Sequence, residues 1–131
     1  MILKAYKYRL NPTKEQDTLI KKSIGSSRFI YNWALNVRIE KYKDDKKIIS
    51  SFDLINTMKK ELKDSEEYSW IKEVPAQGLQ TSIRNLENAY KRFFKKQSKF
   101  PKFKKKRNGG SFTFPQGTSI NFETKRIFLP V

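Results

Sequence analysis

The stretch PAQGLQTSIRNLENAYKRFF, residues 75–94, carries the clearest helical pattern in the chain. Large apolar side chains recur in it at alternating steps of four and three, at Leu79, Ile83, Leu86, Tyr90 and Phe93. That spacing puts them on one face of an α-helix, and such a face is buried against other elements. Pro75 suits the first helical position, where no intrahelical bond needs the N–H that proline lacks.

Two helices are predicted in the N-terminal third of the chain. Thr13 and Gln16 have the spacing of a capping box, so the first helix should begin at Lys14. The Gly-Ser-Ser stretch at residues 25–27 interrupts the apolar pattern, and a second helix should run over about residues 27–43. Two helices joined by a short glycine-containing turn have the outline of a helix-turn-helix, although any antiparallel helix pair gives the same trace.

A third helix and several strands complete the predicted order of elements. Ser51 can cap a helix whose apolar residues extend to Leu62. Residues 2–10 alternate in character, which is typical of a half-buried strand. Three short C-terminal segments also favour strands, at residues 111–114, 119–122 and 127–129.

The order of these elements predicts the fold class. The strand at residues 2–10 has no strand next to it in sequence, so we expect it to pair with the C-terminal strands. The helices then form one long insertion. The sequence predicts a single α+β domain, with four helices flanked by an N-terminal strand and a C-terminal β-hairpin.

Positive charge is concentrated in the last third of the chain, which has a formal net charge of +16. No acidic residue lies between Glu87 and Glu123, whereas that stretch holds ten basic ones. The aromatic side chains interleaved with them are Phe93, Phe94, Phe100 and Phe103. Cations release counterions from phosphates, and aromatic rings stack on bases. The pattern therefore favours a nucleic-acid partner.

Missing residue types exclude several kinds of chemistry. The chain has no Cys and no His, which removes zinc sites and any nucleophile or general base of those types. Its acidic residues mostly lie beside lysines on predicted helices, as in a solvated salt-bridged face. No phosphate-binding glycine motif is present. On its own the chain is expected to be a binding protein with no cofactor and no metal, rather than an enzyme.

The sequence predicts neither a membrane protein nor an exported one. No apolar run approaches the ~20 residues of a membrane span. The N-terminus resembles no signal peptide. Together with the absence of cysteine, these features favour the cytoplasm of a prokaryote.

Several motifs resemble one family. Residues 8–16, YRLNPTKEQ, and residues 28–35, RFIYNWAL, resemble the start of the TnpB (OrfB-type) proteins of bacterial and archaeal insertion sequences. Further along, residues 79–80, LQ, residues 86–94, LENAYKRFF, and residues 100–104, FPKFK, are similar to the same family in the same order. The resemblance covers essentially the whole chain.

The resemblance implies a particular domain plan. Full-length TnpB is an RNA-guided DNA endonuclease, and its N-terminal part combines a β-barrel wedge domain with an inserted helical recognition domain. By this resemblance, residues 1–10 are the first wedge strand. Residues 11–98 are the helical insertion with its helix-turn-helix region, and residues 99–131 are a basic connector followed by strands of an incomplete, partial wedge barrel.

The resemblance also implies partners and a missing activity. The family's catalytic part, a RuvC-like nuclease with three acidic metal ligands, lies beyond residue 131. The chain therefore resembles a truncated protein, a decayed reading frame or a natural short relative, and we expect it to bind nucleic acid without cutting it. Guide RNA and target DNA are the expected partners, together with the C-terminal nuclease part of the family.

Contacting residues follow from the same resemblance. A short target-adjacent DNA motif should be read by Phe52, Asn56, Gln77, Gln80 and Gln116. A glutamine amide can pair bidentately with adenine, and an apolar ring can contact a thymine methyl. The residues expected to contact phosphates of RNA or heteroduplex are Lys4, Lys7, Arg9, Arg92, Lys95, Lys96, Lys99, Lys102, Lys104, Lys105, Lys106 and Arg107. Phe100 and Phe103 either stack on bases or anchor their loop.

Three other functions fit part of the pattern. A helix-turn-helix repressor would place residues 27–43 in the major groove, but that segment is expected to expose charges of both signs, Arg28, Arg38 and Glu40. A general RNA-binding protein would show no preference for duplex DNA. A protein of anionic membrane surfaces would need an amphipathic helix in the basic stretch, which Pro101 and the glycines at 109–110 interrupt.

Overall fold

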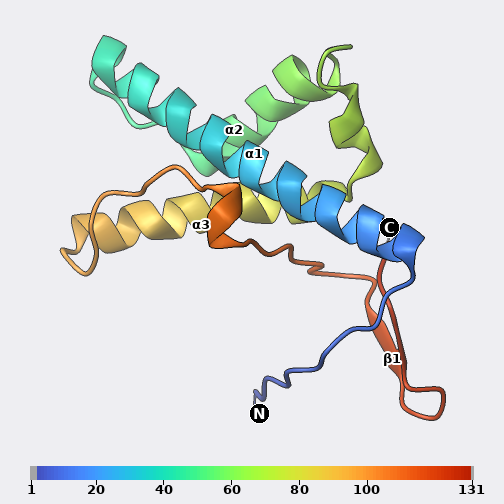
Figure 1. Ribbon diagram of the computed structural model, residues 1–131. Helices are drawn as coiled ribbons and strands as arrows, with labels where there is room; N and C mark the ends of the chain where they lie inside the picture. Colours follow the sequence, from blue (N-terminus) through green and yellow to red (C-terminus); the bar gives the residue numbers. More distant parts are fainter. Residues whose placement is uncertain (1–2, 131) are drawn as a thin grey trace.

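The computed structural model describes residues 3–130 and shows a body of crossing helices with a β-hairpin beside it (Figure 1). Its α-helices are α1 (Lys14–Asp45), α2 (Ser51–Met58) and α3 (Ala76–Phe94). Short turns lie between and after them, a π-helical turn at Lys59–Lys63 and 3₁₀ turns at Ser69–Glu73 and Lys106–Asn108. The hairpin strands are β1 (Ser119–Asn121) and β2 (Arg126–Phe128). The predicted α+β class is confirmed, with three α-helices in residues 3–130 where four were predicted.

α1 is one uninterrupted helix of 32 residues, so the predicted break at residues 25–27 is wrong. The small side chains there allow close packing instead. Ser26 is 1% exposed, and the Ser27 hydroxyl is hydrogen-bonded to the Ser82 hydroxyl of α3. A glycine inside a helix costs about 1 kcal/mol relative to alanine, which is too little to break a helix whose face is buried. The helix ends at Asp45, followed by Lys46 in the left-handed region.

The starts of α1 and α2 follow capping chemistry. The Thr13–Gln16 capping box is confirmed: the Gln16 N–H donates to the Thr13 hydroxyl at 3.2 Å, and the Thr13 N–H donates to the Gln16 side chain at 2.9 Å. α2 is capped by Ser50, whose hydroxyl accepts from the Asp53 N–H at 3.1 Å. The prediction of Ser51 as the cap is wrong by one residue, because Ser50 has the extended backbone that a cap requires.

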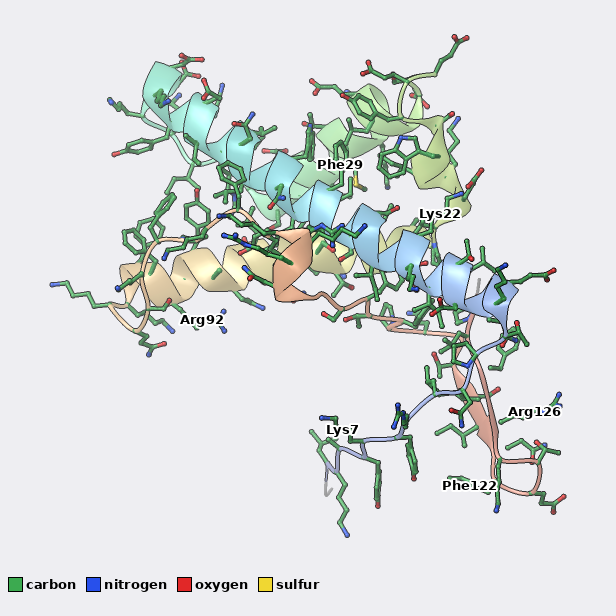
Figure 2. All side chains as sticks on the ribbon, in the orientation of Figure 1. Lys7, Lys22, Phe29, Arg92, Phe122 and Arg126 are labelled. Carbon is green, nitrogen blue, oxygen red and sulfur yellow. The ribbon has the colours of Figure 1, made fainter. Side chains whose placement is uncertain are left out.

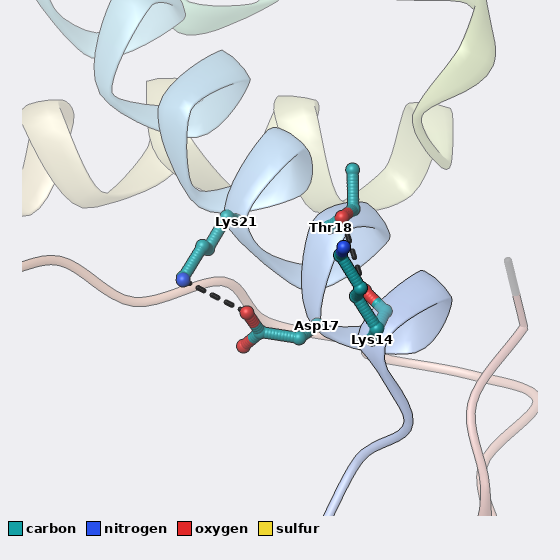
Figure 3. A network of polar contacts seen from close by, with 4 residues as sticks. All are labelled: Lys14, Asp17, Thr18 and Lys21. Atoms are coloured by element: carbon teal, nitrogen blue, oxygen red, sulfur yellow. Dashed lines mark hydrogen bonds and ion pairs between the residues drawn. The ribbon is translucent and has the colours of Figure 1, made fainter.

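Exposed side chains support the first turns of α1 (Figure 3). Lys21 Nζ lies 2.8 Å from the Asp17 carboxylate, and the Thr18 hydroxyl donates to the Lys14 carbonyl at 3.0 Å. An exposed ion pair of this spacing contributes only about 0.3–0.5 kcal/mol. This network therefore stabilises the helix locally and forms no site.

The core lies where α1, α2 and α3 meet. α3 buries the face that the sequence predicted, with Leu79, Ile83 and Leu86 fully buried and Tyr90 7% exposed. The fully buried partners from α1 and α2 are Ile30, Ala34, Leu35, Leu54 and Met58. Pro75 occupies the N-cap of α3, one position before the predicted one. α1 packs mainly against α3, which it crosses in Figure 1.

Strand structure in residues 3–130 is limited to the hairpin. β1 and β2 pair antiparallel with Ile120 opposite Ile127, and the Asn121 side chain accepts N–H bonds from the following turn. The predicted strands at residues 3–10 and 111–114 are wrong for the described chain, because neither segment has a hydrogen-bonded neighbour. Residue 2, the start of the first predicted strand, lies outside the described residues.

Candidate nucleic-acid interface

In the structure the basic connector begins directly after α3, at residue 95 and not at the predicted residue 99, and the name is used below for residues 95–110. It leaves α3 through a tight reversal. Gln97 N–H donates to the Arg92 carbonyl and Lys96 N–H donates to the Phe93 carbonyl, both at 2.9 Å. This pair of bonds is a Schellman motif, which normally has glycine at the left-handed position. Here Lys96 takes that position with φ of 61°. The chain then runs back across the helices toward the hairpin (Figure 1).

Phe100 and Pro101 fix the first part of the connector to α3. The Phe100 ring packs edge-on against Tyr90 at 5.4 Å and Phe93 at 5.3 Å between ring centroids. Pro101 is buried beside it in sequence. Phe100 is still 42% exposed, so one part of its ring faces solvent. Phe103 is exposed as well.

Asn32 of α1 holds the middle of the connector. Its side-chain nitrogen Nδ2 donates to the Lys104 carbonyl at 3.0 Å, and its oxygen Oδ1 accepts from the Lys104 N–H at 2.7 Å. The Lys104 ammonium lies 4.3 Å from the centroid of the Tyr31 ring, which is within cation–π range. Burial raises the pKa of the Tyr31 hydroxyl, against the opposing effect of the Arg92 charge.

The end of the connector lies against α1, and the segment just beyond it lies against α3. A β-carbon added at Gly110 would sit 2.6 Å from Cγ2 of Ile24 in α1. Just beyond the connector, Phe112 covers Gly78 of α3 so closely that a β-carbon there would sit 2.0 Å from its ring. A β-carbon at either position would force the facing side chain to move, because backbone and side chain approach each other without room for a methyl group.

The basic side chains of the connector are solvated. All of the connector residues predicted to contact phosphate are exposed, namely Lys95, Lys96, Lys99, Lys102, Lys104, Lys105, Lys106 and Arg107. Within residues 3–130 the ion pairs use Lys21, Lys22, Lys41 and Lys43, and none of them uses a connector residue. Apart from the cation–π contact of Lys104, these charges are available to a ligand.

Not all predicted basic residues gather in one patch. Lys4, Lys7 and Arg9 lie on the exposed segment that precedes α1. Figure 2 shows Lys7 on this segment, well apart from Arg92 on α3. The candidate interface is therefore described on the connector and the end of α3, with Lys7 apart from Arg92.

The residues predicted to read a DNA motif form two groups. Gln77 of α3 and Gln116 come together, with the Gln77 amide nitrogen donating to the Gln116 oxygen at 3.2 Å. Gln80 is half-buried three residues further along α3. Phe52 and Asn56 lie on α2, where Phe52 is 73% exposed and Asn56 lines a shallow cavity with Lys41, Lys47 and Lys60. Within the described chain, no hydrogen bond links the α2 pair to the glutamine pair.

Arg38 of α1 was expected on an exposed face, and that expectation is wrong because the side chain is buried. It is 3% exposed, its Nε donates to the Ile49 carbonyl at 3.1 Å, and its guanidinium lies 4.8 Å from the centroid of the Tyr90 ring. Burial lowers the pKa of Arg38, whereas Tyr90 and Glu87 raise it. Arg38 and Phe100 therefore both contact the Tyr90 ring. Its spacing of four and eight residues from Ala34 and Ile30 could have placed it on the inner face.

The described residues do not fit the metal site that a RuvC-like nuclease requires. No group of three or more acidic side chains in residues 3–130 is placed to hold a metal ion. In the same part of the chain, no helix is long and apolar enough to cross a membrane. The arrangement suits binding of an extended anion along the connector.

Comparisons with known proteins give the chain a family. The fold and the cationic surface define a small, basic binding domain. Residues 1–47 match the family model of the OrfB proteins of the IS605 group, described as a helix-turn-helix domain. In the described part of that range, residues 14–45 form the single helix α1, with no turn.

Three curated relatives extend the match. A protein of Escherichia coli K12 named as an RNA-guided DNA endonuclease, InsQ, is 38% identical over 98% of this chain and 32% of its own length. A Streptomyces pristinaespiralis protein named in the same way is 32% identical over 81% of this chain and 26% of its own. The virulence protein VsdF of Salmonella dublin is 27% identical over 80% of this chain and 95% of its own.

The chain belongs to the TnpB/OrfB family and corresponds to its N-terminal region. It spans about a third or less of the length of the two endonuclease-named relatives.

Proposed function

We propose that this chain binds nucleic acid as the N-terminal region of a TnpB-type protein, and that the basic connector holds a guide RNA and its heteroduplex with target DNA. The main support for the proposal is the arrangement of charge along the connector. It presents exposed cations along a path that is fixed to α1 and α3, with no carboxylate paired to any of them in the described residues. Phosphate contacts of this kind position a ligand without reading its sequence.

The continuity of α1 favours this function over a helix-turn-helix repressor. A repressor needs a turn before its recognition helix, so that the second helix can enter the major groove. Residues 14–45 form one helix, and its inner face is buried against α3. The E. coli and Streptomyces relatives, named as RNA-guided DNA endonucleases, add weight to an RNA or heteroduplex ligand.

In this proposal Gln77, Gln80 and Gln116 recognise the bases of the target-adjacent DNA motif, and Phe52 and Asn56 form a second contact group. The bond between Gln77 and Gln116 supports the idea, because it holds two amides in one place while leaving the Gln116 nitrogen free to donate. An amide so oriented can pair with the edge of adenine in a major groove.

The domain plan is part of the proposal. Residues 1–10 and 99–131 supply pieces of a wedge barrel, and residues 11–98 form the recognition insertion. The barrel is completed, and DNA is cut, by polypeptide that corresponds to the C-terminal nuclease part of the longer relatives. This chain holds nucleic acid in the cytoplasm of a prokaryote and carries no nuclease centre of its own.

The salt dependence of binding tests the role of the connector. Binding of a labelled 20-base-pair RNA–DNA duplex is measured by fluorescence anisotropy at 50 to 200 mM salt. The triple variant Lys105→Ala, Lys106→Ala, Arg107→Ala should bind more weakly, with a slope of log K against log salt that is shallower by about 0.9 per lost phosphate contact. Lys104 is left in place because it also anchors the connector.

A matched control removes three lysines from the exposed side of α1. The variant Lys14→Ala, Lys21→Ala, Lys43→Ala takes away the same charge and should leave the slope within error of the wild-type value. Equal slopes for the wild type and the connector variant would refute the assignment. Cleavage of the duplex by the purified chain with Mg²⁺ and guide RNA would contradict the absence of a nuclease centre.

A further inference from the structure

Asn32 joins two parts of the chain that are 72 residues apart in sequence. Its side-chain amide is hydrogen-bonded to both backbone groups of Lys104: it donates to the carbonyl at 3.0 Å and accepts from the N–H at 2.7 Å. One donor and one acceptor on a single planar group reproduce what a neighbouring strand would offer to an extended chain. In residues 3–130 no strand pairs with the connector, and Asn32 offers this donor and acceptor from the side of a helix.

We propose that Asn32 is a positioning residue for nucleic-acid binding, which holds the basic connector in the path that its cations need. The proposal rests on the proposed function and adds a residue that carries no charge and contacts no ligand. Asn32 acts through Lys104 on the neighbouring cations Lys102, Lys105 and Lys106. The Tyr31 ring helps by holding the Lys104 ammonium at 4.3 Å.

The connector needs such an anchor because its own chemistry opposes order. Residues 102–107 contain five cations and no acid, so the side chains repel one another. Regular structure in this stretch is limited to the single 3₁₀ turn at Lys106–Asn108. Phe100 and Pro101 fix the chain before the cations, and Gly110 lies against Ile24 after them. Asn32 supplies the fixed point in between.

Prior order matters for affinity because a flexible segment loses conformational entropy when it binds. A segment that is already held in its bound path avoids that cost, and its affinity rises without any new contact. Removal of the Asn32 amide should therefore weaken binding without changing how many phosphates are neutralised. This separates Asn32 from a residue that contacts phosphate, whose loss lowers the salt slope.

The test is a double-mutant cycle on the 20-base-pair heteroduplex. Asn32→Ala in the wild-type background should weaken binding about tenfold, with the salt slope unchanged. In the background of Lys105→Ala, Lys106→Ala, Arg107→Ala, the same change should weaken binding at most about threefold, because two of the three cations that it positions, Lys105 and Lys106, are gone. Non-additivity of this size marks residues that act together. Asn36→Ala, on the exposed side of the same helix, is the control and should have no effect in either background.

Hydrogen exchange gives an independent readout of the anchor. The Lys104 amide should be protected in the wild type and should exchange at least tenfold faster in Asn32→Ala, while core amides such as that of Leu86 keep their protection. If Asn32→Ala does not fold, Asn32→Asp replaces it, with Asn36→Asp as the control for added charge. The aspartate still accepts from the Lys104 N–H but cannot donate to its carbonyl, so affinity should fall more than in the control.

The outcomes are distinct. Additive losses in the cycle would mean that Asn32 contacts the nucleic acid itself, and unchanged affinity in Asn32→Ala would mean that the anchor is dispensable; either result overturns the inference. Failure of the wild-type chain to bind the heteroduplex would instead overturn the proposed function, so the two failures cannot be confused.

Discussion

Replacement of Gly25 by alanine distinguishes a continuous α1 from a helix-turn-helix. In the structure Gly25 is inside a 32-residue helix, and a β-carbon there would have its nearest neighbour, Nη2 of Arg28, at 3.7 Å. That distance is ordinary van der Waals contact, so the methyl group fits. Alanine is favoured over glycine in a helix interior by about 1 kcal/mol. We expect Gly25→Ala to raise the free energy of unfolding by about 1 kcal/mol and Tm by about 4 °C.

Urea unfolding followed by circular dichroism measures this difference, with equal m-values required for the comparison. Gly110→Ala is the control, because its β-carbon would sit 2.6 Å from Ile24 and should destabilise the protein. A glycine in a turn between two helices would typically be left-handed, where alanine costs about 1–2 kcal/mol. Destabilisation by Gly25→Ala would therefore refute the continuous helix.

Three further predictions concern the anchoring of the connector and the core beneath it. Lys96→Gly should stabilise the protein by about 0.5–1 kcal/mol relative to Lys96→Ala in urea unfolding, because residue 96 has φ of 61° and both variants remove the charge; equal stabilities would argue against the left-handed backbone. Gly78→Ala should lower the free energy of unfolding by about 1–3 kcal/mol, because its β-carbon would sit 2.0 Å from the Phe112 ring. In a protein that already carries Phe112→Ala, most of this loss should disappear. Additive losses in the double variant would count against this contact. Burial raises the pKa of Tyr31 and of Tyr90, so the folded state keeps these protons to higher pH than the unfolded state does. The resulting stability is present below about pH 10, where unfolded tyrosine is neutral, and is lost as pH rises through the folded pKa values. The free energy of unfolding should therefore fall less above pH 10 in Tyr90→Phe than in the wild type. The same pH dependence in both proteins would contradict the assignment.

Local patterns predicted those parts of the fold that local chemistry determines. The Thr13–Gln16 box and the buried face of α3 depend on residues within one or two helical turns, and both are confirmed. The Gly-Ser-Ser stretch at residues 25–27 was misread because small residues also occur where helices approach closely. Only the position of Ser82 on α3, 55 residues from Ser27, shows which reason applies.

Strands were the least predictable elements. Residues 3–10 alternate as a strand should, but a strand exists only where a neighbour supplies hydrogen bonds. The hairpin at 119–128 contains its own partner and was found. The described chain offers none to residues 3–10.

For the candidate site, composition shows the cations but not their arrangement. The ten basic residues after Glu87 are visible in the sequence, and so is the absence of acids among them. The sequence does not indicate the role of Asn32, because asparagine is common on helices. Its role becomes visible only in the structure, where Lys104 lies beside it. Arg38 shows an intermediate case, since its helical spacing indicates burial but the Tyr90 ring that it meets does not follow from the pattern.

Lysine footprinting shows which face of the protein the nucleic acid covers. The chain is acetylated under limiting conditions with and without a saturating RNA–DNA heteroduplex, and the modified residues are measured by mass spectrometry. We expect strong protection of Lys102, Lys105 and Lys106, with unchanged reactivity of Lys14, Lys21 and Lys43 on the exposed side of α1. Protection of the α1 lysines with the connector lysines left reactive would contradict this expectation.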